Sequence, residues 1–192
     1  MTCWWWIRHG PTHADGLIGW TDLPADLSDR AALDRLARHL PDDALVISSD
    51  LARARSTADA IQRNRPRLPD SPSLREINFG AWEGKTHAEI SQTHPELGRT
   101  YWSTPGDTAP PDGESWNQAA LRVSQFVDEM NSRHAGTDIV AVAHFGVILT
   151  QIQRAADMAP ASALSFTIDN LSLTRIEFLN PGWRVLGVNH RP

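Results

Sequence analysis

Three short apolar runs restrict the folds available to this chain more than any other feature of its sequence. Residues 4–7, 44–47 and 139–143 contain no polar position. A strand that is covered on one face alternates apolar and polar residues, whereas a strand that is covered on both faces does not. Each run is therefore expected to be a strand inside a mostly parallel sheet that carries helices on both faces.

Amphipathic segments occupy the intervals between these strands. One helix is expected to start after an N-cap at Ser28 and to stop at Pro41. The other helices are expected at residues 51–64, 88–93, 116–136 and 147–156, and further strands at residues 164–168, 171–178 and 183–188. Strands that alternate with amphipathic helices indicate an α/β protein built as a three-layer α/β/α sandwich.

Length and composition limit the class of protein further. The chain has 192 residues, which fits a single domain over residues 1–192. Its net charge of −5 and its lack of a basic tract argue against nucleic acid and anionic membranes as partners. No apolar run approaches the roughly 20 residues of a membrane-spanning helix. A single cysteine, Cys3, excludes an internal disulfide, so we expect a cytoplasmic protein. The Pro-rich residues 103–115 are expected to form a substrate lid or a surface connection within the domain.

Charged and polar side chains follow the apolar runs where the strands are expected to end. Arg8 and His9 follow the first run, Ser48-Ser49 follow the second with Arg53 one helical turn later, and His144 follows the third. The carboxyl ends of parallel strands meet at one edge of a sheet, where α/β proteins bind ligands. Because guanidinium groups bind phosphate through paired hydrogen bonds, the sequence predicts a phosphate pocket at this edge.

Two of these positions suggest a reaction. His9 is the candidate nucleophile, since an imidazole in line with phosphorus can attack it and form a phosphohistidine. Neighbouring arginines favour the neutral, nucleophilic imidazole. Glu76, which lies among Leu74, Ile77 and Phe79, is the candidate general acid because a partly desolvated carboxyl can hold a proton near neutral pH.

Other aromatic and histidine residues have structural alternatives. The tryptophans at residues 4–6 are expected in the core. Trp20 and Trp82 lie in loops expected near the pocket, and each is expected either to line it or to pack behind it. His13 follows His9 by four residues, but Gly10-Pro11 between them argues against a helix and therefore against a shared metal site.

Five motifs occur in order along the chain. They are Arg8-His9-Gly10, residues 48–58 (SSDLARARSTA), residues 74–84 (LREINFGAWEG), Gly113-Glu114-Ser115 and Ala143-His144. Together they resemble the histidine phosphatase superfamily, also called phosphoglycerate mutase-like. Within it, the FGAWEG stretch and the Gly-Glu-Ser box are most similar to the branch of α-ribazole phosphatases and broad-specificity phosphatases.

The resemblance implies a fold, a reaction and roles for particular residues. It implies a phosphoglycerate mutase-like sandwich in which His9 is phosphorylated and Glu76 donates the proton. Arg8, Arg53 and His144 then form the phosphate pocket, and neither a metal nor a cofactor is required. Candidate substrate-binding residues are Thr12, which matches a pocket hydroxyl of the family, Gly19 in a loop that touches substrate in relatives, Asp15 and Phe145.

Three positions depart from the family pattern. Pro11 replaces the glutamate that is common after Arg-His-Gly in mutases. Asp15 stands where many members have a pocket asparagine, and an anion there repels phosphate unless it is protonated or turned away. Phe145 replaces the usual glycine after the second histidine and narrows the space beside His144.

These observations predict a phosphomonoesterase that acts on a small-molecule phosphate ester. Two alternatives remain open from the sequence: a cofactor-dependent phosphoglycerate mutase, and a phosphate-binding protein without catalysis. Pro11 argues against the first, and the presence of both His9 and Glu76 argues against the second. No oligomeric state follows from the sequence.

Overall fold

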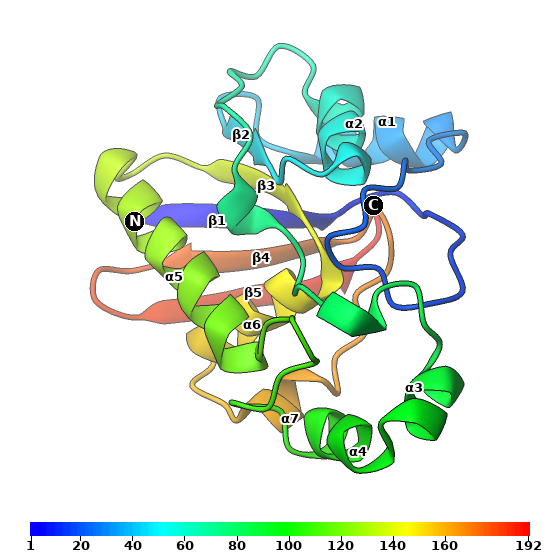
Figure 1. Cartoon of the computed structure of the whole chain (residues 1–192). Helices are drawn as coiled ribbons and strands as arrows, with labels where there is room; N and C mark the ends of the chain where they lie inside the picture. Colours follow the sequence, from blue (N-terminus) through cyan, green and yellow to red (C-terminus); the bar gives the residue numbers. More distant parts are fainter.

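Five strands form one mixed sheet at the centre of the computed structural model, which describes residues 1–192 (Figure 1). They are β1 (Thr2–Arg8), β2 (Leu45–Ser48), β3 (Ile139–Ala143), β4 (Leu173–Phe178) and β5 (Trp183–His190). Their order is β2-β3-β1-β4-β5, with parallel pairing of β2, β3 and β1 and antiparallel pairing of β4 with β1 and with β5. Only β4 therefore runs against the other strands, which confirms the mostly parallel sheet.

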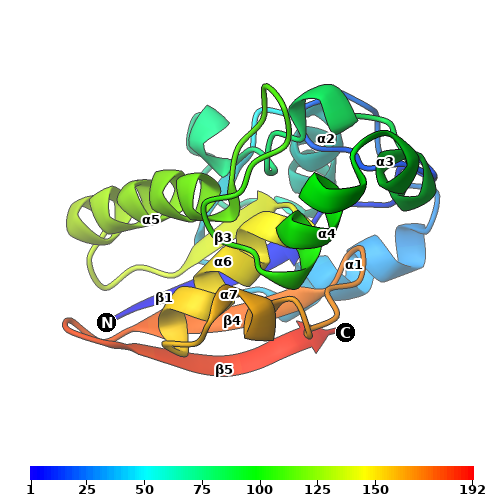
Figure 2. The same ribbon diagram turned by 60° about the horizontal axis from the view of Figure 1, so that its bottom comes forward.

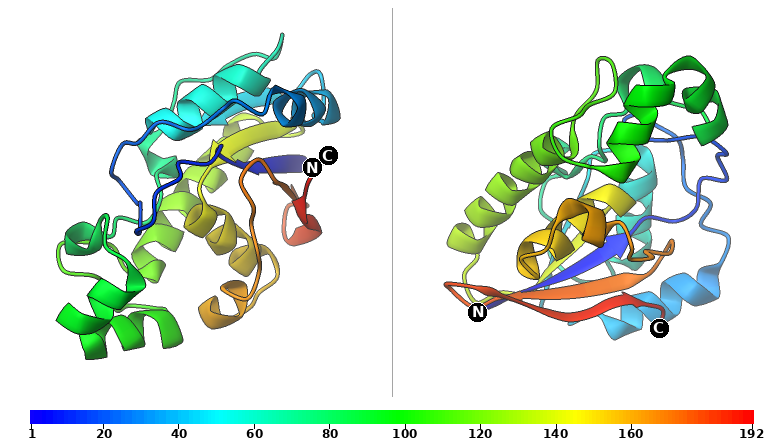
Figure 3. Two further views of the ribbon diagram at one scale, coloured as in Figure 1. Left: turned by 90° about the vertical axis from the view of Figure 1, so that its right-hand side faces the viewer. Right: turned by 90° about the horizontal axis from the view of Figure 1, so that it is seen from below.

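Helices cover both faces of this sheet. They are α1 (Arg30–His39), α2 (Ala52–Ile61), α3 (His87–Thr93), α4 (Pro95–Ser103), α5 (Trp116–Arg133), α6 (Phe145–Ala155) and α7 (Pro160–Ala163), with 3₁₀ turns at Pro72–Leu74 and Gly80–Trp82. Helices α1 and α2 cover one face, and α5 and α6 cover the other (Figures 1 and 2). The α3–α4 pair stands beyond the sheet (Figure 3). This arrangement is the expected three-layer α/β/α sandwich.

Strand β1 contributes to the core on both of its faces. Trp4 and Trp6 belong to the core on the α5–α6 face, and Trp5 and Ile7 belong to the core on the α1–α2 face. The rings of Trp4 and Trp6 stack with centroids 5.0 Å apart, and Trp4 Nε1 donates to Asn131 Oδ1 at 2.9 Å. The unbroken apolar run is thus explained by burial on two sides, as predicted.

Two local predictions were wrong. The N-cap of α1 is Asp29, whose carboxylate accepts from the Ala32 amide at 2.9 Å, whereas the Ser28 amide bonds back to Asp26. Residues 164–168 are not a strand, because the amides of residues 164–166 bond to carbonyls of residues 160–163 at the end of α7 and are not available for a sheet. The sequence also gave no prediction of α4. None of the helices combines the length and apolarity needed to cross a membrane.

Candidate active site

The register of β1 and β3 brings two histidines together. Arg8 is paired with Ala143, so the residues that follow, His9 and His144, leave the sheet side by side. Their ring centroids are 5.0 Å apart. Arg53 reaches the same place from the first turn of α2, which follows β2. The predicted convergence at the carboxyl ends of three strands is therefore present.

Two hydrogen bonds define the state of the His9 ring. Nδ1 lies 2.6 Å from the carbonyl oxygen of Gly10, which can only accept, so Nδ1 carries the proton. Nε2 then has a free lone pair, which accepts from Arg53 Nε at 3.2 Å. Burial, followed by the positive charge of Arg53, lowers the pKa of His9 to about 3. The imidazole is thus neutral at neutral pH.

The loop at residues 19–21 holds the guanidinium of Arg53. Its Nη1 and Nη2 donate to the carbonyls of Thr21 and Gly19 at 2.9 and 2.6 Å. The carboxylate of Glu83 fixes this loop, accepting from the amides of residues 19–21 and from the Thr21 hydroxyl. Arg53 therefore has little freedom to leave His9.

Arg8 is the second arginine of the site, and His144 is its second histidine. Arg8 Nη1 donates to the Ile168 carbonyl at 2.6 Å, and its guanidinium lies over the Phe145 ring, 5.5 Å from the centroid. His144 is completely buried, and neither of its ring nitrogens has a hydrogen-bond partner. Burial lowers the pKa of His144 well below its ordinary value, so this ring is also neutral.

Glu76 presents a buried carboxyl on the other side of the pocket. Its Oε1 accepts from the Ile77 amide at 2.9 Å, and its Oε2 accepts from the Gly146 amide, in the first turn of α6, at 3.0 Å. Burial raises the pKa of Glu76, although these two hydrogen bonds and the nearby arginines oppose the shift. The group can thus hold a proton at a higher pH than an exposed glutamate.

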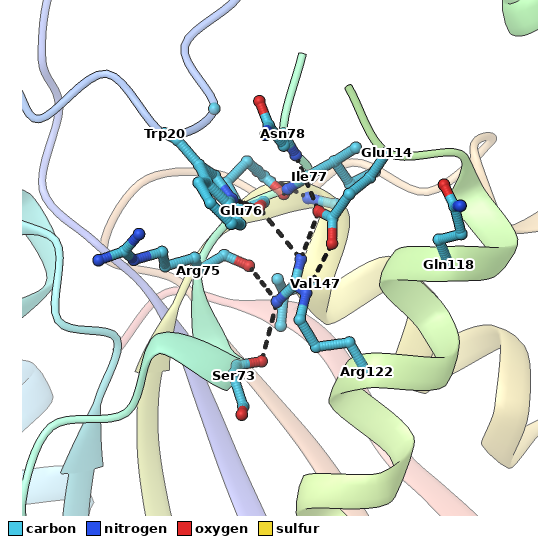
Figure 4. A network of polar contacts seen from close by, with 12 residues as sticks. Trp20, Ser73, Arg75, Glu76, Ile77, Asn78, Glu114, Gln118, Arg122 and Val147 are labelled. Atoms are coloured by element: carbon cyan, nitrogen blue, oxygen red, sulfur yellow. Dashed lines mark hydrogen bonds and ion pairs between the residues drawn. The ribbon is translucent and has the colours of Figure 1, made fainter. Parts of the chain in front are cut away.

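An ion pair behind the pocket fixes the segment that carries Glu76 (Figure 4). Arg122 of α5 donates to three carbonyls within residues 73–76, at 2.9 to 3.3 Å. It also forms a two-point ion pair with Glu114, at 2.8 and 2.7 Å, and Glu114 accepts from the Asn78 amide. The backbone on both sides of Glu76 is thereby tied to α5.

Arg8, His9, Arg53 and Glu76 line a cavity of about 280 Å³, whereas His144 lies behind the lining, buried beside His9. The cavity lining combines polar residues at one end with a mostly apolar and aromatic wall: Arg8, His9, Thr12, Ala14, Gly16, Leu17, Ile18, Arg53, Glu76, Ile77, Phe79, His87, Tyr101, Trp102, Pro105, Trp116, Phe145, Gly146 and Leu164. Nowhere in the structure do three or more His, Cys, Asp or Glu side chains form a group that could hold a metal ion.

The predicted substrate-binding residues occupy different places. Thr12 and Phe145 line the cavity. Gly19 does not line it, but its carbonyl accepts from Arg53. Asp15 is exposed and does not line it, so its carboxylate lies outside the pocket that Ala14 and Gly16 help to form.

The two loop tryptophans are packing residues. Trp82 is fully buried and contacts Tyr101 edge to face. Trp20 is 36 % exposed, lies under the guanidinium of Arg75 and donates to the Glu76 carbonyl at 2.8 Å. His13 does not line the pocket either: its side chain is exposed and bonds to Asp26 at 2.8 Å.

Several supporting residues were not predicted. Arg122, Glu83 and Glu114 are described above. Thr57 Oγ1 accepts from the Gly10 amide at 2.9 Å and donates to the Arg53 carbonyl at 2.7 Å, and Asn170 Nδ2 donates to the His9 carbonyl at 2.8 Å. Thr57 lies inside a motif of the sequence, but nothing local to Asn170 or Arg122 indicates their contacts.

The fold and the pocket define an α/β protein that gathers two arginines, two neutral imidazoles and a buried carboxyl at the carboxyl edge of its sheet. The chain belongs to branch 1 of the histidine phosphatase superfamily, whose family model matches residues 4–191. This match confirms the family suggested by the sequence motifs.

Individual relatives agree with this placement. Adenosylcobalamin/alpha-ribazole phosphatase from Escherichia coli is 30 % identical over 172 residues, which cover 86 % of this chain and 84 % of the relative. Glucosyl-3-phosphoglycerate phosphatase from Mycolicibacterium vanbaalenii is 36 % identical over 157 residues, or 74 % and 68 % of the two chains. The solved structure of Bacillus stearothermophilus YhfR has a TM-score of 0.88 and 30 % identity, and the match covers 97 % of this chain and 96 % of that one.

Proposed function

We propose that this protein is a phosphomonoesterase that hydrolyses a small-molecule phosphate ester through a phosphohistidine on His9, without a metal or a cofactor. The observation that carries the proposal is the unprotonated Nε2 of His9, which faces Arg53 in a pocket that Arg8 and Glu76 also line. A cytoplasmic location is part of the proposal and rests on the single cysteine, Cys3.

In the first step, the phosphoryl group binds to Arg8 and Arg53, which neutralise its charge. His144 donates an N–H to a phosphoryl oxygen through one of its unpartnered nitrogens. His9 Nε2 attacks phosphorus and forms a P–N bond. The P–O bond to the alcohol breaks as Glu76 transfers its proton to the leaving oxygen.

In the second step, the Glu76 carboxylate removes a proton from a water molecule that attacks phosphorus. The P–N bond breaks and its electron pair returns to Nε2. Inorganic phosphate leaves, His9 is neutral again, and Glu76 is again protonated. Burial supports this cycle because it favours the uncharged form of both groups.

The names of two relatives support hydrolysis, since they describe phosphatases of α-ribazole and glucosyl-3-phosphoglycerate. A third relative, from Arabidopsis thaliana, is named phosphoglycerate mutase-like protein 4, and what argues against a mutase is Pro11, which replaces the glutamate common in mutases. A binding protein without catalysis needs phosphate contacts but neither a neutral histidine in line with the phosphate nor a buried acid beside it.

The test is the loss of activity and of the covalent intermediate in His9→Asn. Hydrolysis of phenyl phosphate in EDTA should fall on the order of a thousandfold or more, as for other enzymes that lose their nucleophile. Wild-type protein mixed with ³²P-labelled ester and quenched in alkaline SDS should carry a label that is stable in base and lost in acid, and the variant should lack this label. His13→Asn is the matched control, because His13 is exposed and does not line the pocket. Full activity of His9→Asn, or complete inhibition by EDTA, contradicts the proposal.

A further inference from the structure

The cavity has two chemically distinct ends. The phosphate end contains Arg8, His9, Arg53 and Glu76. The rest of the lining includes aromatic and aliphatic side chains from several elements: Phe79, Tyr101, Trp102, Trp116 and Leu164. In a phosphomonoesterase this second end faces the alcohol part of the substrate, so it selects the leaving group.

Trp102 of α4 is the central side chain of the aromatic end. It packs edge to face on Tyr101, with ring centroids 4.7 Å apart at 89°, and on His87, with centroids 4.8 Å apart at 62°. The ring of Phe79 lies 6.4 Å from it. Contacts on several sides hold Trp102 in place, so the apolar surface exists before a ligand binds.

The distribution of charge in the cavity disfavours leaving groups that carry a negative charge. Arg8 and Arg53 are the only lysine or arginine side chains in the lining, and the phosphoryl group occupies both. A carboxylate or a second phosphate on the alcohol then has no ammonium or guanidinium group to pair with in a mostly apolar surrounding, which is unfavourable. The cavity volume of about 280 Å³ lies near the lower bound of roughly 300 Å³ for small-molecule sites, which favours one ring system over an extended ligand.

Resting on the proposed phosphatase activity, we infer that the preferred substrates are phosphate monoesters of uncharged alcohols that carry a planar apolar ring, and that Trp102 is the residue that determines this specificity. The ring packs against Trp102 and its aromatic neighbours, while the ester oxygen reaches Glu76. Recognition of the alcohol is thus assigned to α4, an element separate from the strands that carry the reacting groups.

The experiment compares the phosphate esters of two primary alcohols, whose leaving groups have similar intrinsic reactivity. The esters are 2-(1-naphthyl)ethyl phosphate and 2-hydroxyethyl phosphate, and the measured quantity is the ratio of their kcat/KM values. Wild-type protein should prefer the naphthyl ester by at least about tenfold, the discrimination that an apolar pocket typically provides. Trp102→Ala should reduce this ratio about tenfold, mainly through a higher KM for the naphthyl ester, and Trp102→Phe should restore part of it.

The matched control is Trp183→Ala, because Trp183 lies on β5 over Arg154 and outside the cavity lining. This variant should keep the wild-type ratio. Equal kcat/KM values for the two esters in the wild-type protein, or an unchanged ratio in Trp102→Ala, overturn the inference and leave the proposed activity intact.

If the wild-type protein hydrolyses neither ester, the proposed phosphatase activity is contradicted instead. Calorimetry with the intact naphthyl ester then decides the specificity question. Binding at least about tenfold tighter to wild-type protein than to Trp102→Ala supports the assignment, and equal or undetectable binding to both overturns it.

Discussion

His9 and Glu76 have pKa values that burial displaces in opposite directions. Burial disfavours any charged form, so it lowers the pKa of the imidazole to about 3 and raises the pKa of the carboxyl. Each shift favours the form that the proposed first step uses: a neutral nucleophile and a protonated acid. One physical cause accounts for both preferences.

The proposed acid can be tested by its dependence on the leaving group. Glu76→Gln should lose about a hundredfold or more in kcat/KM with an alkyl phosphate, whose alkoxide needs a proton, and least with p-nitrophenyl phosphate. Wild-type activity toward the alkyl ester should decline as pH rises through the raised pKa of Glu76, because the acid works only when protonated. Steady-state kinetics across pH measures both effects.

A substitution at Arg122 tests whether this residue positions the segment that carries Glu76. We expect Arg122→Lys to show a weaker form of the same dependence on the leaving group, about tenfold for the alkyl ester, since an ammonium cannot reproduce the planar fork that holds Glu114 and residues 73–76. Arg133→Lys, in an exposed ion pair with Glu129 on the same helix, should behave as wild type. An equal loss with both esters in Arg122→Lys indicates instability rather than misplacement of Glu76.

At the scale of elements, one buried arginine joins the ends of α1 and α2. The guanidinium of Arg65 donates to the carbonyls of Ala37, Leu40, Pro41 and Ile61. The last carbonyls of a helix have no partner within the helix, so each needs one elsewhere. Arg65 supplies such donors to both helices that cover this face of the sheet.

Arg65→Met should therefore destabilise the fold without a direct effect on the pocket. Loss of these donors leaves buried carbonyls unpaired, and we expect a decrease of about 2–4 kcal/mol in the free energy of unfolding. Urea denaturation measures it. Arg63→Met is the control, because Arg63 is exposed and close in sequence. A change below about 0.5 kcal/mol in Arg65→Met, the range of ordinary surface substitutions, contradicts this role.

The sequence predicted elements best where their pattern was unambiguous. Strand β3 was predicted with its observed bounds because a five-residue apolar run between a loop and a histidine has few alternatives. Helix α4 was not predicted, since its sequence, PELGRTYWS, buries only Gly98 and Tyr101 and has no continuous apolar stripe. Residues 164–168 have strand-like composition, but local turn bonds use their amides.

At the scale of the whole molecule, the buried imidazoles link stability to pH. His9 and His144 are neutral in the folded protein but take up protons in the unfolded chain below its pKa of about 6.5. The unfolded state then binds more protons, so stability decreases as pH falls from about 6.5 toward about 3. Glu76 acts in the opposite sense, since its raised pKa reduces stability as pH rises above about 4.3.

Urea denaturation between pH 4 and pH 7 tests this linkage. The free energy of unfolding of the wild-type protein should rise with pH over this range, and His9→Asn should show a shallower rise. Over this range the difference attributable to His9 is on the order of 3 kcal/mol, from its pKa of about 3 in the folded state and about 6.5 in the unfolded chain. Glu76→Gln should show a steeper rise than wild type. Parallel curves for wild type and His9→Asn contradict the assigned burial.

The sequence indicated where the proposed reacting groups lie but not the residues that support them. Arg8, His9 and His144 were predictable because each directly follows or ends a strand, and strand ends share an edge. The contact of Asn170 with His9 spans 161 residues, so no periodicity or turn signal near either residue encodes it. The aromatic wall has the same origin, because α4 meets the pocket only through tertiary packing.

Strand β1 has neighbours that come from the distant end of the polypeptide. It holds residues 2–8, yet it lies between β3 at residues 139–143 and β4 at residues 173–178. On the ribosome, His9 is therefore synthesised well before both strands that hold β1 have emerged. Nascent fragments that end before β4 at residues 173–178 are expected to be inert, and activity should arise only after this strand has left the ribosome.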